Sequence, residues 1–568
     1  MTIDNTRVFI LAALFALIGG LIVVRLGYLQ IMQHDYFSVL ADETHVRKFE
    51  IPAQRGEILM QDRDGPTPVA LNRNRKTLYA DTRYIYDADK VLSELQAITG
   101  EDYREEISDT DGYVELEEEL DFAQAEAIEE QELSGVGLSD NYVRDYPEAE
   151  LAAQTLGFVN HDDEGQYGVE EYFDEQLRGV PGMFDAQTDS QGIPLATKDN
   201  IQQQPEPGAD VVLNLDRNLQ YFMESALEEA VTDKQAESAH GMVMEVETGA
   251  VLAMGNYPSF DPNQYHRVDS HDLYQNAVVS SQFEPGSGFK MFTMAAGLDS
   301  DAVSPDTTYE DEGRVEVADS EIRNVLASQG TTDMREVIVR SLNTGAVYVL
   351  ESLGENAVDE EAKQQLYEYF SDRFALDEPT GIDMPGEVNL NMHTPESVGP
   401  VEYANMSFGQ GVATSMVRMT TSMAALVNDG VMYKPRVIDY YQNGDDVYRS
   451  EPEVAAEYLI SAETSQQLRA MMQEVVDDGG GFGAGVEGYT VGGKTGTAEI
   501  PDGAGGYFDD RYIGTFTGFA PVEDPQYVMM VRLDDPQTDD FAGNDAARVF
   551  GDIMEDVLQY RGVQPADN

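Results

Sequence analysis

The pair of side chains in this sequence best suited to covalent chemistry is a serine followed three residues later by a lysine, Ser287 and Lys290. Both lie in the segment Glu-Pro-Gly-Ser-Gly-Phe-Lys, residues 284–290. The proline and glycine favour a turn into a helix, on which residues i and i+3 share one face about 5–6 Å apart. The dipole at a helix start stabilises a serine alkoxide and helps to lower the pKa of a nearby lysine. A hydroxyl nucleophile beside a base is the minimal equipment for acyl transfer.

The rest of the composition leaves few alternatives to a lysine base. The chain of 568 residues has no cysteine, which excludes disulfides, thiol chemistry and cysteine-bound metals. Its seven histidines are scattered, and none lies in a ligand-spaced pair or beside residues 284–290. We therefore expect no histidine-based triad, no metal site and no cofactor.

The charge balance is extreme, with 106 acidic against 35 basic residues and a net charge of −71. Such a chain is repelled by phosphates, so we expect no nucleic-acid partner. Acid excess with only nine lysines suggests a protein that works in high salt, where self-repulsion is screened. Intrinsic disorder is the competing explanation, and it is disfavoured because 42% of the residues are hydrophobic.

Two further motifs strengthen the interpretation of Ser287. Ser341-Leu-Asn343 lies 54 residues after it, and Lys-Thr-Gly-Thr, residues 494–497, lies in a predicted strand. A lone Ser-x-x-Lys occurs by chance in many chains, whereas three such motifs in this order are far more specific. Two of the nine lysines fall within them.

On these motifs the chain resembles the penicillin-recognising serine acyltransferases, and most closely the class B penicillin-binding proteins. The motif triplet of that family is Ser-x-x-Lys, Ser-x-Asn and Lys-Thr-Gly. The resemblance covers nearly the whole length. It includes further short segments at residues 55–58, 62–65, 168–173, 215–220, 258–262, 381–387 and 407–411. One departure is Gly288, where the family usually has a bulkier residue.

The resemblance implies that three residues carry the acyl transfer. Ser287 would attack the penultimate D-Ala carbonyl of a peptidoglycan stem peptide. Lys290 would be the base, with its pKa lowered by a second cation, Lys494. Ser341 would relay the proton to the leaving D-Ala. An amine of a neighbouring strand would then close the crosslink, and β-lactams would acylate the same serine.

The resemblance also implies which residues hold the substrate. Asn343 would hydrogen-bond the substrate amide. The last motif supplies Lys494, Thr495, Gly496 and Thr497, whose cation and hydroxyls would hold the terminal carboxylate. Backbone N–H groups of Thr497 and of the nucleophile would form the oxyanion hole.

An apolar run at residues 8–24, flanked by Arg7 and Arg25, predicts a transmembrane anchor. The run is slightly shorter than the ~20 residues that span a bilayer, but apolar residues up to Met32 can extend it. A cleaved signal peptide is the alternative, yet no small-x-small site closes the run. Arg7 predicts that residues 1–7 are a cytoplasmic tail. The body of this single-pass protein would then lie outside the cytoplasmic membrane.

The expected fold class is α+β, with two domains after the anchor. Residues 25–205 would form an N-terminal α+β pedestal, or dimerisation, domain, in which the acidic residues 101–134 favour two solvated helices. Residues 206–568 would form a β-lactamase-like transpeptidase domain with an antiparallel sheet flanked by helices. Its expected elements are strands at 211–215, 241–246, 250–254, 489–499, 512–520 and 527–533, a helix capped by Asp216, and a closing helix at 546–560.

Two other functions are compatible with the serine motif: a membrane-bound β-lactamase or β-lactam sensor, and a non-catalytic member of a wall-synthesis complex. Asn343 disfavours the sensor branch, and three intact motifs disfavour the non-catalytic one. Glu387-Val-Asn-Leu-Asn391 spells the motif that places a deacylating water in class A β-lactamases, and we interpret it as coincidence. The family also implies that a polytopic glycan polymerase and other wall-synthesis proteins dock on residues 25–205.

Overall fold

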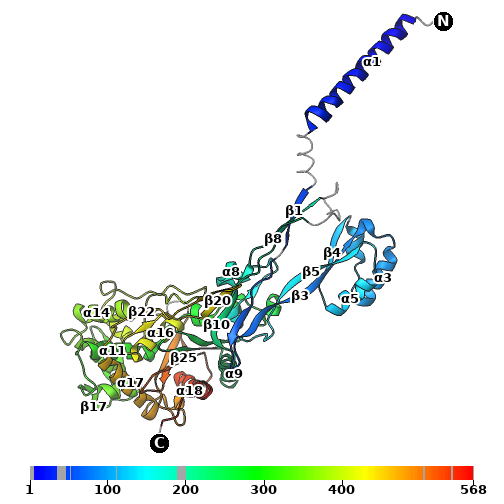
Figure 1. Ribbon diagram of the computed structural model, residues 1–568. Helices are drawn as coiled ribbons and strands as arrows, with labels where there is room; N and C mark the ends of the chain where they lie inside the picture. The colour runs from blue at the N-terminus through cyan, green and yellow to red at the C-terminus, as the bar shows by residue number, and fades with distance from the viewer. Residues whose placement is uncertain are drawn as a thin grey trace. The chain divides into compact units, whose positions relative to one another are not determined.

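The computed structural model divides the chain into two compact units, whose elements are labelled in Figure 1. The smaller unit consists of Met1–Gln54 and Gly179–Gly208, and the larger of Arg55–Arg178 and Ala209–Asn568. The structure describes residues 5–34, 46–51, 53–110, 112–187, 200–502, 506–538 and 541–566.

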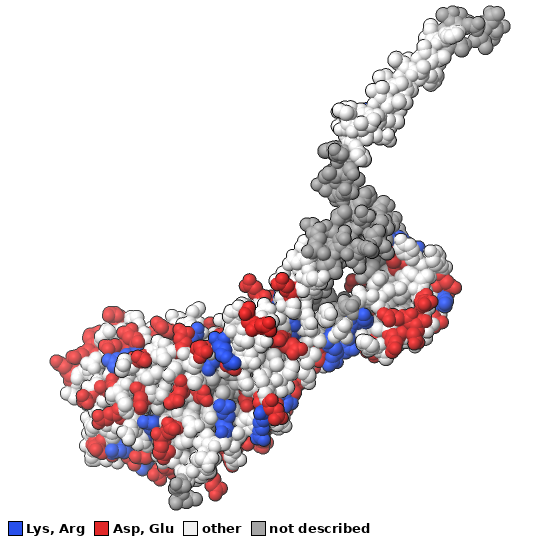
Figure 2. All heavy atoms as spheres, viewed as in Figure 1, with Lys and Arg blue, Asp and Glu red and all other residues white. Residues whose placement is uncertain are grey.

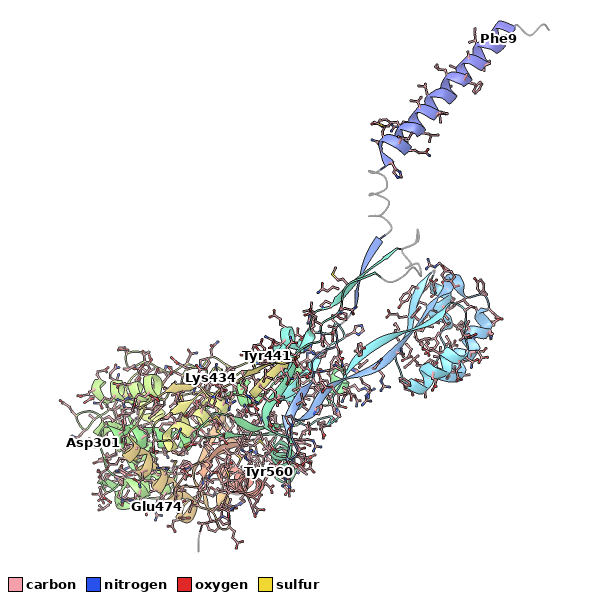
Figure 3. All side chains as sticks on the ribbon, viewed as in Figure 1. Phe9, Asp301, Lys434, Tyr441, Glu474 and Tyr560 are labelled. Atoms are coloured by element: carbon pink, nitrogen blue, oxygen red, sulfur yellow. The ribbon has the colours of Figure 1, made fainter. Side chains whose placement is uncertain are left out.

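The described part of the smaller unit contains a long apolar helix. Helix α1 (Asn5–Gly27) continues as a π-helical turn, η1 (Tyr28–Met32). The stretch Phe9–Met32 has a mean hydropathy of 2.6, and its side chains, from Phe9 on, project freely from the helix (Figure 3). Its 24 residues exceed the ~20 that cross a bilayer, so it fits a single-pass anchor that extends past the predicted end at residue 24.

The same unit holds a three-stranded antiparallel sheet. The strand order is β1-β8-β9, with β1 at Val46–Ile51, β8 at Gly182–Gln187 and β9 at Asn200–Gln203. Segments more than 130 residues apart in the sequence therefore pair, since Val46 lies opposite Gln187 and Ile51 opposite Gly182.

The larger unit begins with a seven-stranded sheet in the order β21-β20-β10-β2-β3-β4, with β5 also paired to β3. The strands are β2 (Ile58–Gln61), β3 (Thr67–Asp81), β4 (Tyr113–Leu120), β5 (Val136–Asp145), β10 (Asp210–Asp216), β20 (Ile438–Asn443) and β21 (Asp446–Arg449). Strands from before residue 205 thus share one sheet with strands from after it. The parallel pairing of β10 with β2, Val211 opposite Ile58, makes this connection.

The two helices predicted for the acidic residues 101–134 are only partly present. Helices α4 (Arg104–Asp109) and α5 (Phe122–Glu130) lie within this range, and α3 (Ala88–Thr99), which contains Leu95, precedes it. All three pack with Leu78 and Leu120 in a small core of their own. The prediction was wrong for β4, a strand that pairs with β3. Leu116 and Leu120 fit both the period-2 pattern of a strand and the spacing of a helix, so local spacing does not decide between the two.

A buried ion-pair cluster joins two of the segments that carry the family resemblance. The Glu170 carboxylate, in α7 (Gly168–Tyr172), is fully buried and accepts hydrogen bonds from Arg55 Nε at 2.8 Å and Arg144 Nε at 2.7 Å. Tyr146 Oη donates to the same carboxylate at 3.1 Å. Two guanidinium groups and a hydroxyl therefore compensate one buried charge.

The largest core of this unit is built on a five-stranded antiparallel sheet in the order β12-β11-β25-β24-β23. The strands are β11 (Ser238–Glu245), β12 (Val251–Tyr257), β23 (Gly492–Pro501), β24 (Tyr507–Ala520) and β25 (Tyr527–Asp534). The predicted hairpin and the three C-terminal strands are confirmed. β11 pairs with β25, with Met242 opposite Met530. Two segments almost 300 residues apart in the sequence therefore meet in one sheet.

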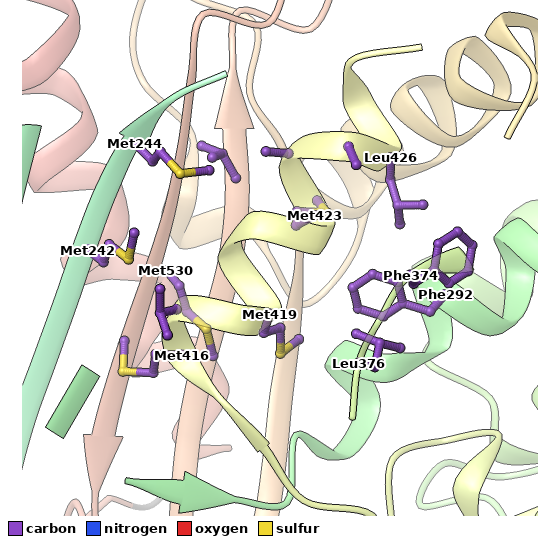
Figure 4. Packing of buried hydrophobic residues seen from close by; sticks show 14 of the residues in the cluster. Met242, Met244, Phe292, Phe374, Leu376, Met416, Met419, Met423, Leu426 and Met530 are labelled. Carbon is purple, nitrogen blue, oxygen red and sulfur yellow. The ribbon is translucent and has the colours of Figure 1, made fainter. Parts of the chain in front are cut away.

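The two faces of this sheet are covered by different helices. Successive side chains of β11 point to opposite faces. Val243 packs with α9 (Arg217–Lys234) and α18 (Ala542–Tyr560). Met242 and Met244 pack with the wholly buried α16 (Met416–Val427), and Figure 4 shows these methionines converging. The predicted capping of α9 is also confirmed.

The remaining elements surround these layers and, apart from α17 with its 17 residues, are short. The helices and helical turns are η2 (Thr82–Tyr84), α6 (Ala153–Leu156), α8 (Asp174–Arg178), η3 (Pro262–Arg267), η4 (His271–Tyr274), α10 (Ala277–Ser280), α14 (Glu360–Tyr367), η6 (Glu368–Arg373), α15 (Pro400–Met406), α17 (Ala462–Asp478) and η7 (Phe482–Ala484). The strands are β6 (Phe158–Val159), β7 (Gly165–Gln166), β13 (Gln282–Phe283), β18 (Thr414–Ser415), β19 (Met432–Tyr433) and β22 (Val454–Ala456).

Acidic side chains are spread over the visible surface of the larger unit and far outnumber basic ones there (Figure 2). They are spread over this face rather than gathered in one patch. This distribution is what a general adaptation of the surface to its solvent produces, whereas a binding site for one cation would concentrate the charge.

Candidate active site

Ser287 lies in a helical turn that leads directly into a buried helix. The turn is η5 (Gly286–Phe289), and helix α11 (Lys290–Asp299) follows it without a break. Gly286 has a φ of +53°, and a Cβ there would lie 2.6 Å from the carbonyl oxygen of Thr497. Only glycine fits both the backbone conformation and this close approach. The predicted turn into a helix is confirmed.

Lys290 is the centre of the site. Its Nζ lies 3.0 Å from Ser287 Oγ, 2.6 Å from the Ser341 carbonyl oxygen and 3.1 Å from Ser341 Oγ. A neutral amine has two protons and one lone pair. It can therefore donate to both oxygens of Ser341 and accept the proton of Ser287, which is the arrangement that a general base requires.

Burial and a second cation favour that neutral amine. Lys290 is 1% exposed, and its burial lowers the pKa well below the ordinary value for lysine. The nearby charge of Lys494 lowers the pKa of Lys290 further. Lys494 and the start of the helix were the causes expected from the sequence, whereas desolvation is the larger cause of the lowered pKa.

Ser341 is held in an unusual backbone conformation. It follows α12 (Met334–Val339) with a φ of +58°, which is uncommon for a residue other than glycine. This conformation lets both its carbonyl and its hydroxyl reach Lys290. Asn343 begins the next helix, α13 (Asn343–Ser352), and its Nδ2 donates to the Arg323 carbonyl at 2.9 Å. Among the described residues, Asn343 does not hydrogen-bond Ser287 or Lys290.

The Lys494 motif lies on β23, the edge strand beside the nucleophile. Lys494 is 1% exposed, burial lowers its pKa to about 7, and its Nζ donates to the carbonyl and hydroxyl of Thr495. A Cβ on Gly496 would lie 2.6 Å from the Pro285 carbonyl oxygen, so this glycine lets the strand approach the turn that bears Ser287. The structure thus places the motif beside the nucleophile.

One residue near the site was not predicted from the sequence. The Gly543 N–H, in the first turn of α18, donates to Thr497 Oγ1 at 3.2 Å. This bond leaves the hydroxyl proton of Thr497 available to another acceptor. A Cβ on Gly543 would lie 2.6 Å from the Gly496 carbonyl oxygen. The predicted helix began at residue 546, so no sequence signal pointed to this glycine.

Two other features bear on the alternative interpretations. The Glu387 carboxylate accepts hydrogen bonds from Thr380 N, Thr380 Oγ1 and Gly381 N at 2.5, 2.6 and 2.8 Å, so it stabilises its own loop. Among the described residues, no group of three or more His, Asp or Glu side chains could hold a metal ion.

Family models match most of the chain. The model described as "Penicillin binding protein transpeptidase domain" matches residues 240–555, and the one described as "Penicillin-binding Protein dimerisation domain" matches residues 50–213. Among curated proteins, stage V sporulation protein D of Bacillus subtilis is 33% identical over 100% of this chain and 88% of its own length. The probable peptidoglycan D,D-transpeptidase PbpC of Pseudomonas aeruginosa is 28% identical over 99% and 96%.

Solved structures agree with these matches. Penicillin binding protein 3 from Mycobacterium tuberculosis, complexed with aztreonam, has a TM-score of 0.70 and 26% identity, covering 91% of this chain and 98% of that one. Penicillin binding protein 2X from Streptococcus thermophilus has a TM-score of 0.76 over 90% and 80%, and at 22% identity it supports the fold alone.

The fold and the Ser287–Lys290–Ser341 geometry define a serine acyltransferase with the β-lactamase-like sheet. The chain belongs to the class B penicillin-binding proteins, the peptidoglycan D,D-transpeptidases that carry a dimerisation domain before the transpeptidase domain. It is therefore a serine-type D-Ala-D-Ala transpeptidase.

Proposed function

We propose that this protein crosslinks peptidoglycan stem peptides through an acyl-enzyme on Ser287, at the outer face of the cytoplasmic membrane. The observation that carries the proposal is the 3.0 Å approach of the buried Lys290 amine to Ser287 Oγ. A serine hydroxyl is a weak nucleophile, and a neutral amine at this distance is placed to remove its proton.

The acylation step follows from the contacts of Lys290. Its Nζ accepts the Ser287 proton while Oγ attacks the penultimate D-Ala carbonyl carbon. The N–H groups of Ser287 and Thr497 stabilise the oxyanion, and losing one such donor costs about 3–4 kcal/mol in the transition state. The tetrahedral intermediate then breaks the C–N bond, and the proton passes through the Ser341 hydroxyl to the nitrogen of the leaving D-Ala.

The substrate would be held on both sides of the nucleophile. Asn343 would hydrogen-bond the backbone amide of the stem peptide. Lys494, with the hydroxyls of Thr495 and Thr497, would bind the terminal carboxylate, while Gly496 leaves room for the chain. The amine of a second stem peptide then attacks the acyl carbon and gives up a proton through Ser341 to Lys290, which passes that proton to Ser287 Oγ as the ester C–O bond breaks. A β-lactam would acylate Ser287 in the same way.

The remaining parts of the chain would place this site at the wall. Residues 1–7 would form a cytoplasmic tail, 8–24 the core of the anchor, 25–205 the pedestal or dimerisation domain and 206–568 the transpeptidase domain. The pedestal would bind a polytopic glycan polymerase and other wall-synthesis proteins. The lipid bilayer is a further partner through the apolar stretch Phe9–Met32.

Labelling with a fluorescent penicillin tests the nucleophile. The wild type should form a stable covalent adduct, Ser287→Ala none, and the exposed control Ser304→Ala a normal one. Label retained by Ser287→Ala would overturn the assignment. Rapid loss of label with turnover of the penicillin would instead favour the β-lactamase alternative.

The proposed topology can be tested directly because the chain has no native cysteine. A membrane-impermeant maleimide should label Gln131→Cys in intact cells, and Asn5→Cys only after permeabilisation. The reverse pattern would refute an extracytoplasmic catalytic domain.

A further inference from the structure

A buried carboxylate lies beneath the start of the helix that carries Asn343. Asp311 ends β14 (Thr308–Asp311), which pairs with β17 (Gly330–Asp333), and it is 1% exposed. Its Oδ1 accepts hydrogen bonds from Gly313 N at 2.9 Å, Asn324 Nδ2 at 2.9 Å and Thr344 Oγ1 at 2.8 Å. The interior charge is thus surrounded by donors.

The same carboxylate closes the loop that follows the hairpin of β15 (Arg314–Val317) and β16 (Ser320–Arg323). Its Oδ2 accepts from Gln329 N at 2.9 Å, at the far end of the loop that begins at Asn324. Asp311 therefore binds both ends of the 324–329 segment. The position of Asn324 is set by a buried group rather than by solvent-exposed contacts.

Asn324 in turn caps the helix of the second motif. Helix α13 begins after Leu342, which has no side chain able to cap it. Asn324 Oδ1 accepts from Thr344 N at 3.0 Å, and its Nδ2 also donates to Thr344 Oγ1 at 3.1 Å. A residue 20 positions earlier in the sequence thus supplies the cap that a local Ser, Thr, Asn or Asp usually supplies.

Arg323, the residue before Asn324, orients the Asn343 side chain. The Arg323 carbonyl accepts from Asn343 Nδ2 at 2.9 Å. The backbone start of α13 and the Asn343 amide are therefore both held by residues 323–324. With Nδ2 fixed in this way, the plane and direction of the Asn343 amide are determined before a substrate arrives.

We propose that Asp311, Asn324 and Thr344 are positioning residues that pre-organise Asn343, and with it the turn that bears Ser341, for acylation of Ser287. The inference rests on the proposed function and extends it to residues that touch neither substrate nor nucleophile. Loss of the network leaves the catalytic groups present but lets the Ser-x-Asn segment move, and small misplacements of this kind lower rates strongly.

The test compares Thr344→Val with Thr344→Ser. Valine keeps the shape but removes the hydroxyl that donates to Asp311 and accepts from Asn324, whereas serine retains it. We expect the second-order rate constant for acylation by a fluorescent penicillin to fall at least about tenfold in Thr344→Val and to stay within about threefold of wild type in Thr344→Ser. Glu310→Gln serves as a control, since it changes an exposed acidic side chain next to Asp311, and this variant should react at the wild-type rate.

The end point separates positioning from loss of folded protein. A positioning defect slows labelling but leaves the final labelled fraction unchanged, whereas partial unfolding lowers the final fraction at an unchanged rate constant. Asn324→Ala, at a partly exposed site, provides a second variant if Thr344→Val does not fold. In the double variant the two losses should be less than additive, because both residues belong to the same hydrogen-bond network.

The outcomes also distinguish this inference from the proposed function. If the wild type is labelled and folded Thr344→Val and Asn324→Ala react at the wild-type rate, the positioning role is overturned and the transpeptidase assignment stands. If the wild type is not labelled at all, the proposed function fails and this inference fails with it.

Discussion

The end of the Met419 side chain occupies the space beside Gly288 where the family usually has a larger residue. A Cβ on Gly288 would lie 2.8 Å from Met419 Cε. Met419 belongs to the buried helix α16 and is labelled in the methionine cluster of Figure 4. At position 288, the space beside the turn is therefore filled by a side chain of helix α16 rather than by a side chain of the turn itself.

This contact predicts coupling between the two positions. Gly288→Ala should change the free energy of unfolding by no more than about 1 kcal/mol, because Gly288 has an ordinary φ and a methionine end can move aside. Met419→Ala should cost about 2–5 kcal/mol through the cavity it creates. Adding Gly288→Ala to Met419→Ala should recover part of that loss. Denaturant unfolding measures the cycle, and additive effects would contradict the packing.

A pH profile of acylation tests the roles of the two lysines. Lys290 must be neutral to act as a base, so the rate should rise as the pH increases through its lowered pKa. Lys494 must be charged to bind a carboxylate, so the rate for free enzyme should fall as the pH rises through about 7. Lys494→Arg stays charged and should shift the alkaline limb upward. If the rate in the wild type fell only near pH 10, burial would not lower the pKa of Lys494.

The buried Lys494 should also cost stability at low pH. Its folded pKa of about 7 lies below the ordinary 10.5, so between these values the unfolded chain binds more protons and stability rises with pH. Lys494→Met should therefore be inactive but more stable than wild type at pH 6 by a few kcal/mol, with the difference shrinking toward pH 10. If Lys494→Met and the wild type were equally stable at both pH values, the pKa of Lys494 would not be lowered by burial. Thermal unfolding followed by circular dichroism measures it.

Glu170→Gln should destabilise the larger unit by about 3–5 kcal/mol, because Arg55 and Arg144 would lose their buried counter-charge. Glu171→Gln is a matched control, since the neighbouring Glu171 is exposed. Both proteins should be compared by denaturant unfolding. A similar, small effect of the two substitutions would show that the cluster contributes little.

The net charge of −71 predicts salt-dependent stability. Molar KCl shortens the Debye length to about 3 Å and screens repulsion among the acidic side chains, so the Tm should rise by several degrees or more between low and molar salt. Sucrose, which is uncharged, separates screening from general exclusion of cosolute. A flat response to KCl would refute the high-salt adaptation and leave the enzymology untouched.

Much of the site was predictable because its motifs are short and local. Ser287 and Lys290 share a turn, and Lys494 to Thr497 share a strand. The strand β4 was mistaken for a helix because Leu116 and Leu120 fit either spacing, and only the pairing with β3 selects the strand. Domain-level order followed from the sequence, but the sheet shared by β2 and β10 did not.

By itself, the sequence determined which groups could react, the apolar N-terminal helix, the absence of cysteine chemistry and the acidic surface, since these depend on residue type and local spacing. The tertiary structure decided which groups meet. Burial lowers the pKa of Lys290, the Arg323 carbonyl orients Asn343, and Asn324 caps a helix that has no side-chain cap of its own. Desolvation and long-range hydrogen bonds arise only after distant segments pack together, so no local pattern encodes them.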